Sequence, residues 1–159
     1  MRPGSLRSWS WLGGGLLAAL IAIQLVPYGQ AQTNPATVAE PAWDSPATRA
    51  LAKQACFDCH SNETYWPPYA RIAPASWLIQ RDVVEGRAVL NFSEWNRPQE
   101  EAKEAGKVIQ EGEMPPVAYK LMHSHARLSA ADRNLLAQGL AKTLGTGAGN
   151  NDDDERGER

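Results

Sequence analysis

Cysteine is scarce in this chain, and the sequence has no basic block. The 159 residues include two cysteines, two phenylalanines and three histidines, and the formal net charge is −2. Because there is no cluster of positive charge and no nucleic-acid-binding motif, we expect no nucleic-acid partner. At most one disulfide bond is possible, and it would close so short a loop that it would restrict the unfolded chain little.

The two cysteines stand together in one short motif, Cys56-Phe57-Asp58-Cys59-His60, which reads C-x-x-C-H. This pattern is the attachment signature of a c-type haem. Each thiol adds to one vinyl group of the porphyrin, and the histidine that follows becomes an axial ligand of the iron. The sequence therefore predicts one haem c, bound covalently through Cys56 and Cys59, with His60 as the proximal iron ligand.

The same motif has other interpretations. A C-x-x-C pair can form a dithiol redox centre, but such centres occur in a βαβ setting and the flanking residues here are helical in pattern. A zinc site would recruit Cys56, Cys59, His123 and His125, although their spacing does not match common zinc modules. A disulfide between the cysteines is also possible outside the cytoplasm. Haem attachment explains the motif best.

A second axial ligand decides whether a haem binds small molecules or carries electrons. Met114 is the strongest candidate, because it lies in a loop before Pro115 and Pro116. Proline stiffens the backbone that would hold the sulfur, and a thioether ligand raises the reduction potential. His123 and His125 are competing candidates.

The N-terminus has the features of a membrane signal. Arg2 and Arg7 precede an uncharged stretch at residues 8–30, which is long enough to cross a bilayer. We predict an uncleaved transmembrane anchor at residues 1–26, and the alternative is a signal peptide cleaved after Ala31. Either interpretation leaves the arginines in the cytoplasm. The globular part is then expected in the periplasm or at the cell exterior, tethered to the inner membrane.

The rest of the chain predicts a small all-α domain. Proline-rich residues 27–44 are expected to form an extended tether, residues 45–144 the haem domain, and residues 145–159 a disordered acidic tail. Cap and breaker residues predict four helices. The first begins at Ser45-Pro46, and the second runs from 75 to about 85 with Gly86 as the stop. The third runs from Pro98 to Gln110, and the fourth from Ser129 to Leu144.

Other residues are candidates for supporting roles around the cofactor. An iron-bound histidine usually donates its other N–H to a carbonyl, and we expect the loop before Pro74-Ala75 to supply it. The candidates for contact with the haem propionates or the haem plane are Arg71, Arg87, Trp77, Trp95 and Tyr119.

Over residues 27–144 the chain resembles the bacterial haem-binding domain family of small monohaem cytochrome c-like proteins. The resemblance is carried by CFDCHSNET at 56–64, APASW at 73–77, EGRAVLNFSEW at 85–95, EGEMPP at 111–116, and Tyr119 with His123 and ARLS at 126–129. It implies a cytochrome c-like all-α fold and a single covalent haem. It also implies thioether attachment at Cys56 and Cys59, with His60 and Met114 as iron ligands.

These features lead us to expect an electron-transfer cytochrome rather than an enzyme. Its partners would be redox proteins at the outer face of the membrane, met in small and transient encounters. The alternative is a haem-based sensor or haem-binding module in which Met114 is displaceable. A peroxidase would need a distal acid–base residue near an open iron, and none is placed convincingly.

Overall fold

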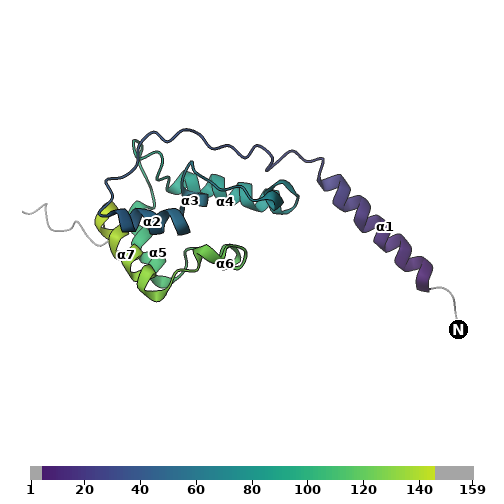
Figure 1. Ribbon diagram of the computed structural model, residues 1–159. Coiled ribbons are helices and arrows are strands. Elements are labelled where there is room, and N and C mark those ends of the chain that lie inside the picture. Colours follow the sequence, from purple (N-terminus) through teal and green to yellow (C-terminus); the bar gives the residue numbers. More distant parts are fainter. Residues whose placement is uncertain (1–4, 146–159) are drawn as a thin grey trace, which may run out of the picture. The chain divides into compact units, whose positions relative to one another are not determined.

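The computed structural model describes residues 5–145, and within this range the fold is all-α, as predicted. The order of the helices along the chain can be followed in Figure 1. Residues 5–145 contain no strand, and Ala39 and Glu94 form an isolated bridge. The predicted acidic tail lies outside the described residues except for Gly145. The α-helices are α1 (Ser5–Ile23), α2 (Pro46–Ala55), α3 (Phe57–His60), α4 (Ala75–Val89), α5 (Ala105–Glu111), α6 (Val117–Met122) and α7 (Ala130–Leu144), and the 3-10 helices are η1 (Pro68–Arg71), η2 (Ala102–Glu104) and η3 (Ser124–Ala126).

The chain forms two compact units. In the described range, the first unit comprises residues 5–33 and 65–84, and the second comprises residues 34–64 and 85–145. Helix α4 begins in the first unit and ends in the second. The C-x-x-C-H motif, Met114 and all three histidines belong to the second unit.

The first unit contains α1 and a segment that folds onto residues 70–76. The Gln24 side chain donates to the Ala73 carbonyl (3.1 Å) and accepts from the Ala73 N–H (3.0 Å). Gly29 has φ +82°, and a Cβ atom there would clash with the Ser76 carbonyl oxygen. In the described residues, no helix has both the length and the apolar character needed to cross a bilayer.

The core of the second unit surrounds the haem motif. Phe57 lies between the two cysteines and is only 2% exposed. Its ring stacks on Phe92 with the centroids 5.6 Å apart, and Trp43 packs against both rings. Burial of large aromatic side chains contributes strongly to stability, so the residue inside the motif anchors α3 to the core. The remaining buried members of this core are Ala52, Ala55, Leu90, Ala102, Ala105, Ile109, Leu136, Ala137 and Leu140.

Two helix starts form as predicted. The Ser45 side chain accepts from the N–H of Thr48, with Pro46 at the first helical position of α2. The Ser129 side chain accepts from the N–H of Asp132 and begins α7. Both are side-chain caps that satisfy backbone donors left over at a helix N-terminus.

Two predicted helix boundaries are wrong. Helix α4 continues through Gly86 to Val89. The predicted helix from Pro98 to Gln110 instead begins as η2, because the segment before it is held in a turn. There the Gln99 side chain donates to the Glu94 carbonyl (2.8 Å) and accepts from the Asn91 N–H (2.7 Å).

An ion pair joins the predicted tether to α2. Glu40 accepts from the Arg49 guanidinium at Nε (2.7 Å) and Nη2 (2.5 Å) and from the Trp43 indole N–H (2.7 Å). The hydrogen bond from Arg49 is the main cause that lowers the pKa of Glu40 below its usual value. Segment 40–49 is therefore held by a charge-assisted contact as well as by the aromatic core.

We expect Glu40→Gln to lower the free energy of unfolding at neutral pH by about 0.5–1 kcal/mol, since the pair is partly exposed to water. Because the pKa of Glu40 is lowered on folding, its contribution is present above the ordinary glutamate pKa and is lost as pH falls through the folded value. Denaturant unfolding should therefore show a larger difference between parent and variant at pH 7 than at pH 3. Glu104→Gln, in an exposed pair with Lys107 at 3.8 Å, is the control. An equal loss at both pH values would contradict the assignment.

Candidate cofactor site

The two cysteines lie at the junction of two helices. Cys56 follows the last residue of α2, where its N–H donates to the Ala52 carbonyl, and Cys59 lies within α3. The His60 N–H donates to the Cys56 carbonyl (2.9 Å), which closes the turn around the motif. Both thiols are partly buried, and no disulfide joins them. The motif therefore sits at the end of the first helix of its unit, as predicted.

The side chain of His60 is fixed by two carbonyl groups. Its Nδ1 atom lies 3.0 Å from the Gly86 oxygen and 3.1 Å from the Leu90 oxygen. A carbonyl oxygen can only accept, so Nδ1 carries the proton. Burial is the main cause that lowers the pKa of His60, which keeps the ring neutral. The lone pair is then on Nε2, as an iron ligand requires.

The predicted source of that carbonyl is wrong. It was expected from the loop before Pro74-Ala75, but Gly86 and Leu90 supply it from the C-terminal end of α4. The Gly86 carbonyl also accepts from the Leu90 N–H (3.0 Å), and Leu90 is the residue directly after α4. Gly86 allows the contact, because a Cβ atom there would lie 2.6 Å from the Cys59 carbonyl oxygen. Gly86 is therefore needed for the close approach of α4 to the motif, and it does not end the helix.

Arg87 forms hydrogen bonds with the segment that follows the haem motif. It was a candidate for contact with the haem propionates, but its Nε donates to the Ser61 carbonyl (2.7 Å). Its Nη2 donates to the Thr64 hydroxyl (2.9 Å) and to the Asn34 side-chain oxygen (3.1 Å). The guanidinium therefore holds the segment that follows His60.

Tyr119 of α6 is bonded to the motif itself. Its hydroxyl donates to the Asp58 carboxylate at 2.5 Å. Burial, followed by the hydrogen bond to Asp58, raises the pKa of Tyr119, so the hydroxyl keeps its proton and remains the donor. The Tyr119 ring stacks on His123 with the centroids 4.1 Å apart. The hydrogen bond between Tyr119 and Asp58 joins α6 to α3 across residues far apart in the sequence.

Met114 lies in the loop before α6. Gly112 ends α5 in a left-handed conformation (φ +79°), and the Met114 N–H donates to the Val108 carbonyl (3.2 Å). The Met114 side chain is 39% exposed. It faces a small cavity of about 110 Å³, whose other lining residues are Pro115, Lys120, Ala126, Arg127, Leu128 and Arg133.

The two histidines considered as competing ligands are both near Tyr119. The His123 Nδ1 atom lies 3.1 Å from the Tyr119 carbonyl oxygen. The His125 ring meets the Tyr119 ring edge-on, and its carbonyl accepts from the Gln54 side chain. Both rings thus pack in a cluster with Tyr119.

The remaining candidate side chains have other neighbours. Trp95 stacks on Phe92 with the centroids 6.4 Å apart, so it packs against the core of the second unit. In the first unit, the Arg71 Nε donates to the Gln32 side chain (3.2 Å). The buried Trp77 indole nitrogen, also in the first unit, has no hydrogen-bond partner among the described residues.

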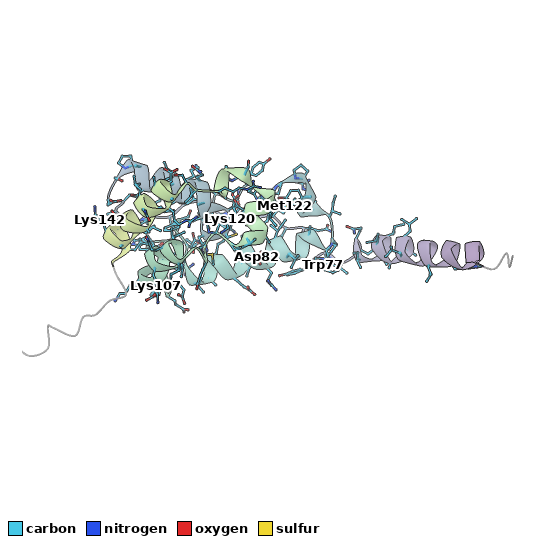
Figure 2. All side chains as sticks on the ribbon, turned by 90° about the horizontal axis from the view of Figure 1, so that it is seen from below. Trp77, Asp82, Lys107, Lys120, Met122 and Lys142 are labelled. Carbon is cyan, nitrogen blue, oxygen red and sulfur yellow. The ribbon has the colours of Figure 1, made fainter. Side chains whose placement is uncertain are left out.

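These residues fit a covalently attached haem. The two thiols and the imidazole occupy one turn, and the imidazole tautomer is the one that binds iron through Nε2. Helix α6 buries none of its residues. Its apolar side chains Val117, Leu121 and Met122 are exposed; Met122 and Lys120 are labelled in Figure 2.

The alternatives to haem find less support. No group of three or more histidine, cysteine, aspartate or glutamate side chains is placed to hold a metal within residues 5–145, so a zinc site of Cys56, Cys59, His123 and His125 is not formed. Burial raises the pKa of the Cys56 thiol to about 12, whereas dithiol redox centres lower it.

Comparison with known proteins agrees with the haem interpretation. No significant match was found among curated proteins or among solved structures. The Haem-binding domain family matches residues 18–142. This range is most of the chain and includes the C-x-x-C-H motif, Met114, and Gly86 and Leu90, whose carbonyls accept from His60. The chain therefore belongs to the Haem-binding domain family and binds haem.

Proposed function

We propose that the protein is a monohaem c-type cytochrome that transfers single electrons and is not an enzyme. The observation that carries the proposal is the state of His60. Its Nδ1–H donates to two backbone carbonyls, and this leaves the lone pair of Nε2 to bind iron. When bound, haem supplies an iron that changes between the ferrous and ferric states. A cytochrome c-like fold for the second unit is part of this proposal.

Each residue of the motif then has one role. Cys56 and Cys59 form the thioether bonds that retain the cofactor, and Phe57 anchors the motif in the core. His60 is the proximal ligand, and the Gly86 and Leu90 carbonyls set the orientation of its ring. Because these carbonyls belong to a helix end and not to a mobile side chain, the ring is held in the same orientation in both oxidation states.

Met114 is the proposed distal ligand. It belongs to the same unit as His60, and its side chain is only partly covered by protein. A neutral thioether favours the ferrous state, which suits a carrier of relatively high potential. With both axial positions filled by protein atoms, small molecules are kept from the iron.

One observation favours a second candidate function. The segment that carries Met114 leads into a helix that buries none of its own residues. Weakly packed segments open at low free-energy cost, so a displaceable Met114 would make the protein a haem-based sensor. Rapid binding of carbon monoxide to the ferrous protein at neutral pH would favour the sensor, and exclusion of carbon monoxide would favour the electron carrier.

The proposed location is the periplasmic side of the inner membrane. It rests on the sequence: Arg2 and Arg7 precede a long uncharged stretch, and covalent haem attachment in bacteria takes place on that side. The proposed partners are redox proteins at the outer face of the membrane. Fractionation of cells distinguishes an uncleaved anchor from a cleaved signal peptide. A tethered protein stays with membranes after a salt wash, and a cleaved protein is released with the periplasm.

The replacement Met114→Ala tests the distal ligand. We expect the ferric protein to lose its far-red sulfur-to-iron absorption, the reduction potential to fall, and imidazole to bind without competition, because the thioether that favours the ferrous state is removed. Met122→Ala, which changes an exposed methionine on α6, is the matched control and should leave the spectrum as it is. An unchanged spectrum in Met114→Ala would reject Met114 and favour His123.

A further inference from the structure

We infer that Tyr119 is a positioning residue for the distal ligand: its hydrogen bond to Asp58 holds the Met114 segment beside the haem-attachment helix. The inference rests on the proposed function, since it concerns how tightly the proposed iron ligand Met114 is held. The carboxylate comes from inside the C-x-x-C-H motif and the hydroxyl from α6, so the bond joins the proximal and distal sides of the site.

The hydrogen bond between Tyr119 and Asp58 has the features of a strong one. It is short, at 2.5 Å, its acceptor is charged, and the contact is partly buried. Hydrogen bonds to charged acceptors in such surroundings are stronger than neutral ones.

Other bonds attach α6 to the unit, and one of them runs from the Lys120 ammonium group to the Gly112 carbonyl (3.5 Å). Helix α6 buries no residue, and its exposed apolar side chains make no core. At its C-terminal end, the Arg127 guanidinium donates to the carbonyls of Lys120 and Leu121. Beyond that end, the His125 carbonyl accepts from Gln54 of α2. Among the bonds that fix α6, the one from Tyr119 reaches the haem motif.

The backbone between Met114 and Tyr119 transmits this restraint. Pro115 and Pro116 follow Met114 directly, and Pro116 caps the N-terminus of α6. Each proline ring fixes one backbone dihedral, so this segment has little freedom to absorb a movement of α6. If the bond from Tyr119 is lost and α6 moves, the Met114 sulfur moves with it. A ligand from solution then competes more easily for the iron.

Tyr119→Phe tests this inference, because it removes the hydroxyl and keeps the ring that stacks on His123. The haem-loaded full chain is oxidised and titrated with imidazole, and the far-red sulfur-to-iron absorption is followed. We expect imidazole to bind about tenfold more tightly than to the parent, given the strength of a hydrogen bond to a charged acceptor. Haem per chain, measured as the pyridine haemochrome, should not change. Tyr28→Phe, at an exposed tyrosine of the first unit, is the matched control and should bind imidazole like the parent.

Replacements at Asp58 separate the bond from a general structural effect. Asp58→Ala should reproduce the effect of Tyr119→Phe, and the double variant should bind imidazole no more tightly than either single variant, because both changes remove one bond. Asp58→Asn keeps an acceptor but not the charge, so its effect should be smaller than that of Asp58→Ala. Full additivity of the two single changes would overturn the inference.

The outcomes distinguish this inference from the proposed function. If Met114→Ala abolishes the far-red absorption while Tyr119→Phe and Asp58→Ala bind imidazole like the parent, the proposed ligand stands and the positioning role of Tyr119 is wrong. If Met114→Ala leaves the spectrum unchanged, the distal ligand is misassigned and the positioning role falls with it.

Discussion

Replacing both Cys56 and Cys59 with serine should abolish covalent haem attachment. Serine hydroxyls do not form thioether bonds with vinyl groups, and the chain has no other cysteine. We also expect a marked loss of thermal stability, because in a small unit the cofactor adds a large apolar surface to a limited core. Intact mass spectrometry of the denatured protein checks the first effect, and thermal unfolding followed by circular dichroism checks the second.

Single replacements give the graded control for this experiment. Cys56→Ser and Cys59→Ser should each retain haem through one thioether, with a shifted absorption band that reports the remaining vinyl group. Phe57 and His60 are unchanged in both variants, so loss of attachment cannot be ascribed to the core or to the ligand. A double variant that still carries haem through denaturation would contradict the assignment of the motif.

Replacing Gly86 with alanine should have the second largest effect. In an exposed helix interior this change stabilises by up to about 1 kcal/mol, because alanine is the better helix former. Here the new Cβ atom would lie 2.6 Å from the Cys59 carbonyl oxygen, so α3 and α4 must separate. We expect a net loss of about 1–3 kcal/mol, the usual cost of overpacking, together with weaker orientation of the His60 ring.

Two measurements on Gly86→Ala follow from this expectation. Denaturant unfolding gives the free-energy change, and the midpoint potential reports the altered hydrogen bonding of His60. Gly14→Ala is the matched control, since a Cβ atom at that helical glycine meets nothing within 4 Å. If Gly86→Ala proves as stable as the parent and keeps its potential, the close contact between α4 and the haem motif is not required.

Local signals in the sequence predicted the parts of the fold that depend on local chemistry. The side-chain caps at Ser45 and Ser129 act within one turn of their own helices, so the starts of α2 and α7 follow from a few residues. The C-x-x-C-H motif is equally local, and it placed two candidate attachment thiols and one candidate iron ligand at one helix junction. The all-α class followed from the same cap and breaker residues.

The features that were missed depend on contacts between distant segments. Gly86 has the same signature as a helix stop, and only the approach of α4 to Cys59 shows that its missing side chain is needed inside the helix. The carbonyl partners of His60 are backbone groups, which no side-chain pattern can reveal. The bond between Tyr119 and Asp58 joins segments separated by most of the domain. The sequence around Tyr119, which lies five residues after Met114, gave no sign of this hydrogen bond.

The most direct test is the pyridine haemochrome spectrum of the unaltered protein, made in cells with a c-type maturation system and extracted with acidified organic solvent. With Cys56 and Cys59 both bonded to one porphyrin, all of the pigment should stay with the polypeptide, at one haem per chain and with the band position of two thioether bonds. A colourless polypeptide, or pigment that passes into the solvent, would contradict the assignment.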